Sequence, residues 1–186
     1  MQLPGLLVEY LIDGSVALLW IIPLLSMVGI TLPSDSSKLV LFFPGLYVVG
    51  MTVDYLARFI VLRWKRKIKK QVYGQFKDKN LSSHEIQAKL TAYSSDLTNA
   101  AEMRSSRDRI ARGTILNSIL ATVFYVLSSL QLGQLNYWVV VLGLTGIALS
   151  SATWARYQYL SYDYEIHAFL ALNEKLKTSS KAKDGS

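Results

Sequence analysis

Residues 39–62 form an almost unbroken apolar run, and the basic run Arg63-Trp64-Lys65-Arg66-Lys67-Ile68-Lys69-Lys70 follows it directly. A helix needs about 20 apolar residues to cross the hydrocarbon core of a bilayer, so this run is long enough for one span. Lys and Arg collect on the cytoplasmic side of such spans. The junction therefore predicts a membrane helix whose carboxyl end faces the cytoplasm.

Three further apolar runs have the length of a span. They cover about residues 14–32, 114–132 and 137–155, and short polar turns follow the first and third spans. Because 51% of the residues are hydrophobic and only 18% are charged, the chain is more apolar than an ordinary soluble domain. We predict an all-α integral membrane protein with four transmembrane helices arranged as two hairpins.

The predicted spans divide the chain into five segments. A first transmembrane hairpin covers residues 1–63, a basic cytoplasmic helical segment 64–113 and a second transmembrane hairpin 114–155. A cytoplasmic helical extension of the fourth span covers residues 156–177, and a disordered tail covers 178–186. Residues 64–113 hold twelve Lys and Arg against five acids, whereas the two short turns share the single cation Lys38. This asymmetry predicts a multi-pass protein of the cell (inner) membrane with both termini cytoplasmic.

Ionisable side chains inside the apolar runs are the first candidates for function. Asp54 and Arg58 lie four residues apart in the second span, with the acid first, so they can form an ion pair near the cytoplasmic interface. Alternatively, Asp54 faces the bundle interior and pairs with Asn117 of the third span or lines a polar path. Glu9 and Asp13 precede the first span. They can complement the helix dipole there, or form a cation-attracting mouth if several copies assemble around an axis.

Small residues in the fourth span predict close helix contact. Gly146 and Ser150 lie four residues apart, and Gly143 precedes them by one turn. The contact can lie within one chain or between copies. Tyr137 and Trp138 at one interface, and Trp64 and Trp154 at the other, match the aromatic belts of membrane proteins.

Two basic clusters flank the predicted cytoplasmic segment. They comprise Arg63, Lys65, Arg66, Lys67, Lys69, Lys70, Arg104, Arg107, Arg109 and Arg112. We predict that they bind anionic lipid headgroups or an acidic soluble protein. Nucleic acid is the weakest alternative, because no recognition motif accompanies the charge.

Apolar residues at helical spacing continue through both polar segments. Ile86, Leu90, Tyr93 and Leu97 share one helical face after the capping box Ser82-Ser83-His84-Glu85. Tyr159, Tyr162, Ile166, Phe169 and Leu176 form a matching stripe beyond the fourth span. We therefore expect the fourth span to run on as a long helix that packs against the helix of the central segment.

Motifs for chemistry are missing from the sequence. It holds no cysteine, no Gly-rich phosphate loop, no zinc-protease helix and no nucleophile elbow. His84 and His167 are the only histidines and neither has a neighbour at metal-ligand spacing. We therefore expect no metal and no cofactor.

The sequence as a whole predicts a non-enzymatic membrane subunit that forms homo-oligomers and presents a basic helical platform to a soluble cytoplasmic partner or ligand. Small bacterial membrane proteins of stress or antiphage systems share this general build, as sensors or effectors. An oligomeric ion channel or membrane-permeabilising pore, gated from the cytoplasmic side, is the alternative. An intramembrane enzyme that uses Asp54 is a third, for which no second catalytic group lies at matching depth.

Overall fold

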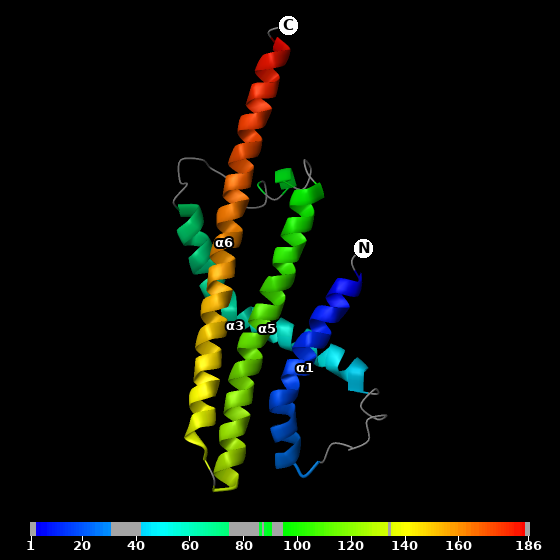
Figure 1. Ribbon diagram of the computed structural model, residues 1–186, viewed down its shortest axis with the longest axis vertical. Helices are drawn as coiled ribbons and strands as arrows, with labels where there is room; N and C mark the ends of the chain where they lie inside the picture. Colours follow the sequence, from blue (N-terminus) through cyan, green and yellow to red (C-terminus); the bar gives the residue numbers. More distant parts are fainter. Residues whose placement is uncertain are drawn as a thin grey trace. The chain divides into compact units, whose positions relative to one another are not determined.

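The described part of the chain forms four long helices. The computed structural model describes residues 3–30, 42–74, 86, 88–90, 95–133 and 135–184. The helices are α1 (Leu3–Met27), α3 (Phe42–Gly74), α5 (Ser95–Gln131) and α6 (Tyr137–Asp184) (Figure 1). Each is long and apolar enough to cross a membrane, and the described residues contain no strand. The all-helical fold with four candidate spans is confirmed.

Two glycines end helices, whereas Pro23 and Pro44 lie within helices without interrupting them. Pro23 lies inside α1 without ending it, as membrane helices tolerate. Pro44 lies in the first turn of α3, where its missing N–H leaves no hydrogen bond unmade, so it does not interrupt that helix. Gly29 and Gly133 follow α1 and α5 with φ angles of 78° and 67°. This left-handed conformation favours glycine and ends a helix.

The two later helices continue beyond their apolar spans. α5 begins at Ser95 and passes through Gly113 without a break to Gln131. α6 extends to Asp184, so the long helical continuation of the fourth span is confirmed. Its end lies beyond residue 177, and most of the segment predicted as a disordered tail is therefore helical.

Contacts divide the chain into two compact units. The first unit comprises Met1–Arg63 and Ser106–Trp154, and the second comprises Trp64–Ser105 and Ala155–Ser186. Residues 106–113, which we had expected to belong with the cytoplasmic segment, thus pack in the first unit. Its apolar core joins Ala17 of α1, Val53 and Ala57 of α3, and Leu116 of α5.

The second unit has apolar cores of its own. In one, Val72 of α3 packs with Tyr162 and Ile166 of α6. In the other, Ile86 and Leu90 pack with Phe169 of α6. The predicted packing of the two stripes is confirmed for these three residues, while the side chains of Tyr93, Leu97 and Leu176 lie outside the described part of the structure.

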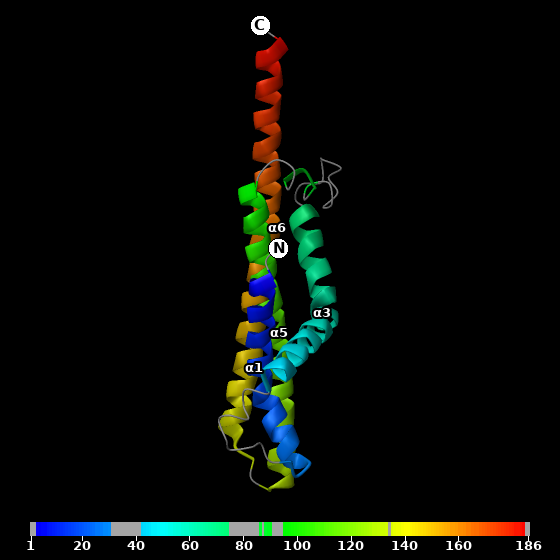
Figure 2. The same cartoon turned by 90° about the vertical axis from the view of Figure 1, so that its right-hand side faces the viewer.

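Within the first unit, α3 crosses α1 steeply at two glycines (Figures 1 and 2). A Cβ atom on Gly14 would overlap the carbonyl oxygen of Leu46, and one on Gly50 would overlap that of Tyr10. The two backbones are therefore in direct contact at this crossing, which only glycine permits. This contact holds Asp54, one turn beyond Gly50, beside the polar side chains of the other helices.

Candidate functional site

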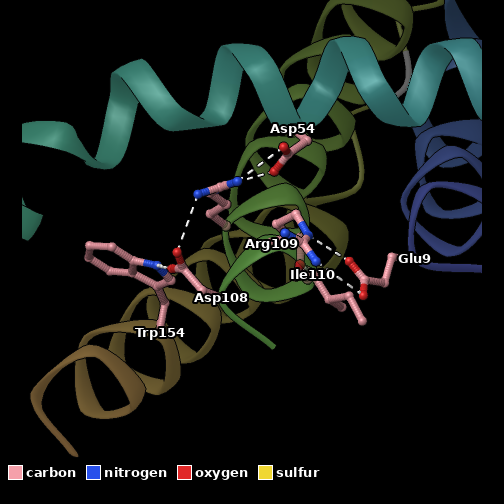
Figure 3. Close-up of polar contacts among 8 residues, drawn as sticks. Glu9, Asp54, Asp108, Arg109, Ile110 and Trp154 are labelled. Carbon is pink, nitrogen blue, oxygen red and sulfur yellow. Dashed lines mark hydrogen bonds and ion pairs between the residues drawn. The ribbon is translucent and has the colours of Figure 1, made fainter. Parts of the chain in front are cut away.

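A row of polar side chains on α5 organises the interior of the first unit. Four of them are Asp108, Arg109, Arg112 and Asn117. Each bonds to a residue of another helix: Arg109 and Asn117 to α1, Arg112 to α3 and Asp108 to α6. Figure 3 shows Asp54 of α3, Glu9 of α1 and Trp154 of α6 converging on α5. We refer to these side chains, together with Asp13 and Trp20, as the polar cluster.

The ion pair between Arg112 and Asp54 is the central contact of the polar cluster. Arg112 Nε donates to Asp54 Oδ1 at 2.7 Å and Nη2 donates to Oδ2 at 3.0 Å. The side chains are only 7% and 13% exposed. This two-bond geometry is the strong form of an Arg–carboxylate pair, so it clamps α3 to α5.

The same arginine extends the cluster to α6. Arg112 Nη1 donates to Asp108 Oδ2 at 3.2 Å, and the other oxygen of Asp108 accepts from the indole N–H of Trp154 at 2.7 Å. Trp154 is fully buried, so it does not belong to an exposed aromatic belt. The prediction for Trp154 was wrong because a tryptophan at the end of an apolar run can lie at the membrane interface or be buried between helices, and its position in the sequence is the same in both cases.

Arg109 makes the corresponding connection to α1. Its Nε donates to Glu9 Oε2 at 2.6 Å, and Nη2 lies 3.4 Å from Oε1 (Figure 3). Glu9 is buried. The acids of α1 and α3 are therefore each paired with an arginine of α5, which fixes how α1, α3 and α5 lie against one another.

Asn117 supplies an uncharged connection deeper along α5. Its Nδ2 donates to the backbone oxygen of Asp13 at 2.9 Å, and its Oδ1 accepts from the indole N–H of Trp20 at 3.0 Å. The side chain is fully buried. The prediction that Asn117 pairs with Asp54 is wrong, since its partners both lie on α1.

Asp13 differs from the rest of the polar cluster. It is 1% exposed, and neither of its carboxylate oxygens has a hydrogen-bond partner among the described residues. The carboxyl group lies against the backbone of α5, where a Cβ on Gly113 would overlap it. A buried carboxyl without a donor is unfavourable in its charged form.

Two predictions about these acids need correction. Asp54 does not pair with Arg58, which is exposed, because Arg112 on a neighbouring helix offers it a buried two-bond contact. Glu9 and Asp13 do not complement the dipole of a first turn, because α1 begins at Leu3. Since both are buried, they do not form an open mouth in the single chain.

The predicted basic surface loses two of its members. Arg109 and Arg112 bind Glu9 and Asp54 inside the first unit, so they are not available to lipid or a partner, and their assignment is corrected. The other cations are exposed or partly exposed: Arg63, Lys65, Arg66, Lys67, Lys69, Lys70, Arg104 and Arg107. Within the second unit, Lys69 lies over the ring of Tyr73 and Arg104 over that of Tyr164.

The small residues of α6 make their contact within the chain. A Cβ on Gly143 would overlap Thr122 of α5, and one on Gly146 would lie 4.0 Å from the Ser118 hydroxyl oxygen. Ser150 is partly buried. The predicted close approach therefore joins α6 to α5 at Gly143.

Sequence reasoning missed several residues that build this site. Gly14, Gly50 and Gly113 lie at helix contacts, and Trp20 and Asp108 bond within the polar cluster. Only the spacing of Asp108 and Arg112, four apart on one helix face, was a usable signal.

Comparison with known proteins adds nothing to this description: no family model, curated protein or solved structure matches the chain. The function is therefore argued from the geometry alone.

Proposed function

We propose that the chain is a non-enzymatic, multi-pass subunit of the inner cell membrane that self-assembles and presents its second unit to the cytoplasm as a basic helical platform. The platform binds a soluble protein with an acidic surface. The observation that carries this proposal is the separation of apolar and charged side chains along residues 64–74 of α3. Apolar side chains there enter a core, while cations remain accessible.

The residues of this segment separate onto different helix faces. Val72 is fully buried and Ile68, one turn earlier, packs against the same core with Tyr162 and Ile166 of α6. Arg66, Lys67 and Lys70 are exposed. Because α6 already covers the apolar face, the segment is held as an ordered helix, and its exposed cations Arg66, Lys67 and Lys70 can meet a partner. Exposed charges of this kind raise the rate of association with a partner and favour partners whose surface charge is complementary.

The polar cluster of the first unit supports a structural rather than a catalytic role for most of its charges. Asp54, the residue considered for intramembrane catalysis, is held in two hydrogen bonds by Arg112. Glu9 and Asp108 are likewise bonded. A satisfied buried network rigidifies a core, and here it keeps four helices in register.

The proposed orientation predicts a pattern of labelling by a membrane-impermeant thiol reagent. The chain holds no cysteine, so single cysteines report without background. We expect Trp138→Cys to react in intact cells and Lys67→Cys to react only after the membrane is opened, since both side chains are exposed and would lie on opposite sides. Reaction of Lys67→Cys in intact cells would contradict the orientation.

The platform itself is tested by photocrosslinking. A photoreactive residue at the exposed position Gln71, beside Lys67 and Lys70, is expected to crosslink a soluble protein in cells. The variant Lys67→Gln/Lys70→Gln should lower the yield by about two- to thirtyfold, because exposed ion pairs contribute ~0.2–1 kcal/mol each. Raised salt should act in the same direction.

The control is Arg156→Gln, which removes an exposed cation that belongs to neither basic cluster and should leave the yield nearly unchanged. Equal loss in both variants, or crosslinking to lipid alone, would contradict a protein-binding platform.

A further inference from the structure

We propose that Asp13 is a proton-binding site inside the first unit, whose side chain holds an exchangeable proton. This goes beyond the proposed platform, which does not depend on Asp13. The proposal is based on the burial of this side chain, on its lack of a donor and on the pairing of the charges around it.

Asp13 lacks both the solvent exposure and, among the residues that the structure describes, the hydrogen-bond donors that usually stabilise a carboxylate. It is 1% exposed, and both oxygens lack a hydrogen-bond partner in the described part of the chain. Its own backbone oxygen accepts a hydrogen bond from Asn117, so α1 is held against α5 at this residue. A buried carboxyl in this situation is far more stable neutral than charged.

The surrounding charges favour the neutral form further. Charged groups near Asp13 are Glu9 on its own helix, Asp54 on α3 and Arg112 on α5. The single cation among them is already bonded to Asp54 through two hydrogen bonds and to Asp108 through a third. Glu9 takes Arg109. Each arginine is therefore occupied, and Asp13 is an acid in excess.

A proton suits this site better than a metal ion. The backbone of α5 lies so close that even a methyl group on Gly113 would overlap the carboxyl group, which leaves no room for an ion and its several oxygen ligands. No group of three His, Asp or Glu residues suited to a metal occurs among the residues described. A proton requires neither space nor further ligands.

Release of this proton would change the balance of the cluster. Arg112 already bonds Asp54 and Asp108, and an ionised Asp13 adds a third carboxylate, from α1, that competes with Asp54, from α3, for this arginine. The guanidinium would then be drawn from one helix towards the other. The site thus couples protonation to the contacts that hold α1 and α3 on α5.

Infrared spectroscopy of the full chain in lipid vesicles tests the proposal, because a protonated carboxyl has a C=O stretch that a carboxylate lacks. We expect this band in the wild type at neutral pH, a shift on deuterium exchange and a further shift when aspartate carboxyls carry carbon-13. It should weaken as pH rises. Asp13→Asn should abolish it, and the control Asp163→Asn, an acid on the second unit with a 37% exposed side chain, should keep it.

Absence of the band in the folded wild type, or its survival in Asp13→Asn, would overturn the proposal. Should Asp13→Asn fail to fold, Asp13→Glu decides the matter, because a glutamic acid keeps a carboxyl at this position but does not carry the aspartate carbon-13 label. A band that loses its carbon-13 shift in this variant assigns the proton to position 13, and a band that keeps the shift overturns the proposal.

Discussion

Arg112→Ala is expected to destabilise the folded chain by about 3–5 kcal/mol, because it leaves the buried carboxylate of Asp54 without a partner. Arg112 also holds Asp108, so the substitution loosens α3, α5 and α6 together. The measurement is the free energy of unfolding in detergent micelles. Tryptophan fluorescence can follow it, since Trp154 is bonded to the same network.

Two variants separate this effect from a general loss of positive charge. Arg107→Ala removes an exposed arginine on the same helix and should change the free energy of unfolding by no more than about 0.5 kcal/mol. Adding Asp54→Ala to Arg112→Ala should recover part of the loss, since the unpaired charge is then gone. Equal stability of Arg112→Ala and Arg107→Ala would show that the pair does not hold the bundle.

Gly50→Ala is expected to separate α1 from α3, with a loss of about 3 kcal/mol or more. The new Cβ would overlap the carbonyl oxygen of Tyr10. Because that atom belongs to a helix backbone and not to a flexible side chain, the overlap is relieved only by moving a helix, which places the loss at or above the usual range for overpacking. Unfolding in micelles measures it.

Gly45→Ala is the matched control for this crossing. It lies on the same helix, and a Cβ there would meet nothing within 4 Å. Alanine is the better helix former by up to about 1 kcal/mol, so this variant should be neutral or more stable. If both substitutions have the same effect, the crossing at Gly50 is not as close as the structure shows.

The two predictions concern different forces that act on the same arrangement. Glycine lets the backbones of α1 and α3 touch, and this brings Asp54 within reach of Arg112. The ion pair in turn prevents α3 from sliding along α5. A bilayer gives packed apolar helices little preference for one register over another, so specific contacts of these two kinds decide it.

The packing of the second unit could be foreseen in part. Ile86, Leu90 and Phe169 lie on apolar stripes that are visible as a spacing of three and four residues, and they do pack together. The prediction succeeded because a helical stripe must be covered and few segments were available to cover it.

The polar cluster could not be foreseen in the same way. Asp54 and Arg58 have the spacing of an ion pair, yet Asp54 binds Arg112. Arg109 and Arg112 resemble a surface cluster in sequence, yet both enter the first unit. Which of several acids meets which arginine depends on the rotation and height of helices that are far apart in the chain, and sequence spacing carries no such information.

The sequence by itself determined that this chain has four apolar helices. Hydropathy and length are local properties of a segment, and they decide whether a helix can cross the hydrocarbon core of a bilayer. It also indicated that helices continue beyond the third and fourth apolar runs, although it did not give the limits of α5 and α6. Only the tertiary structure decided that Asp13 is buried without a donor, that Gly14 and Gly50 meet at a crossing, and that two arginines of α5 join the other helices. These features arise from contacts between distant segments, and they exist only once the helices are packed.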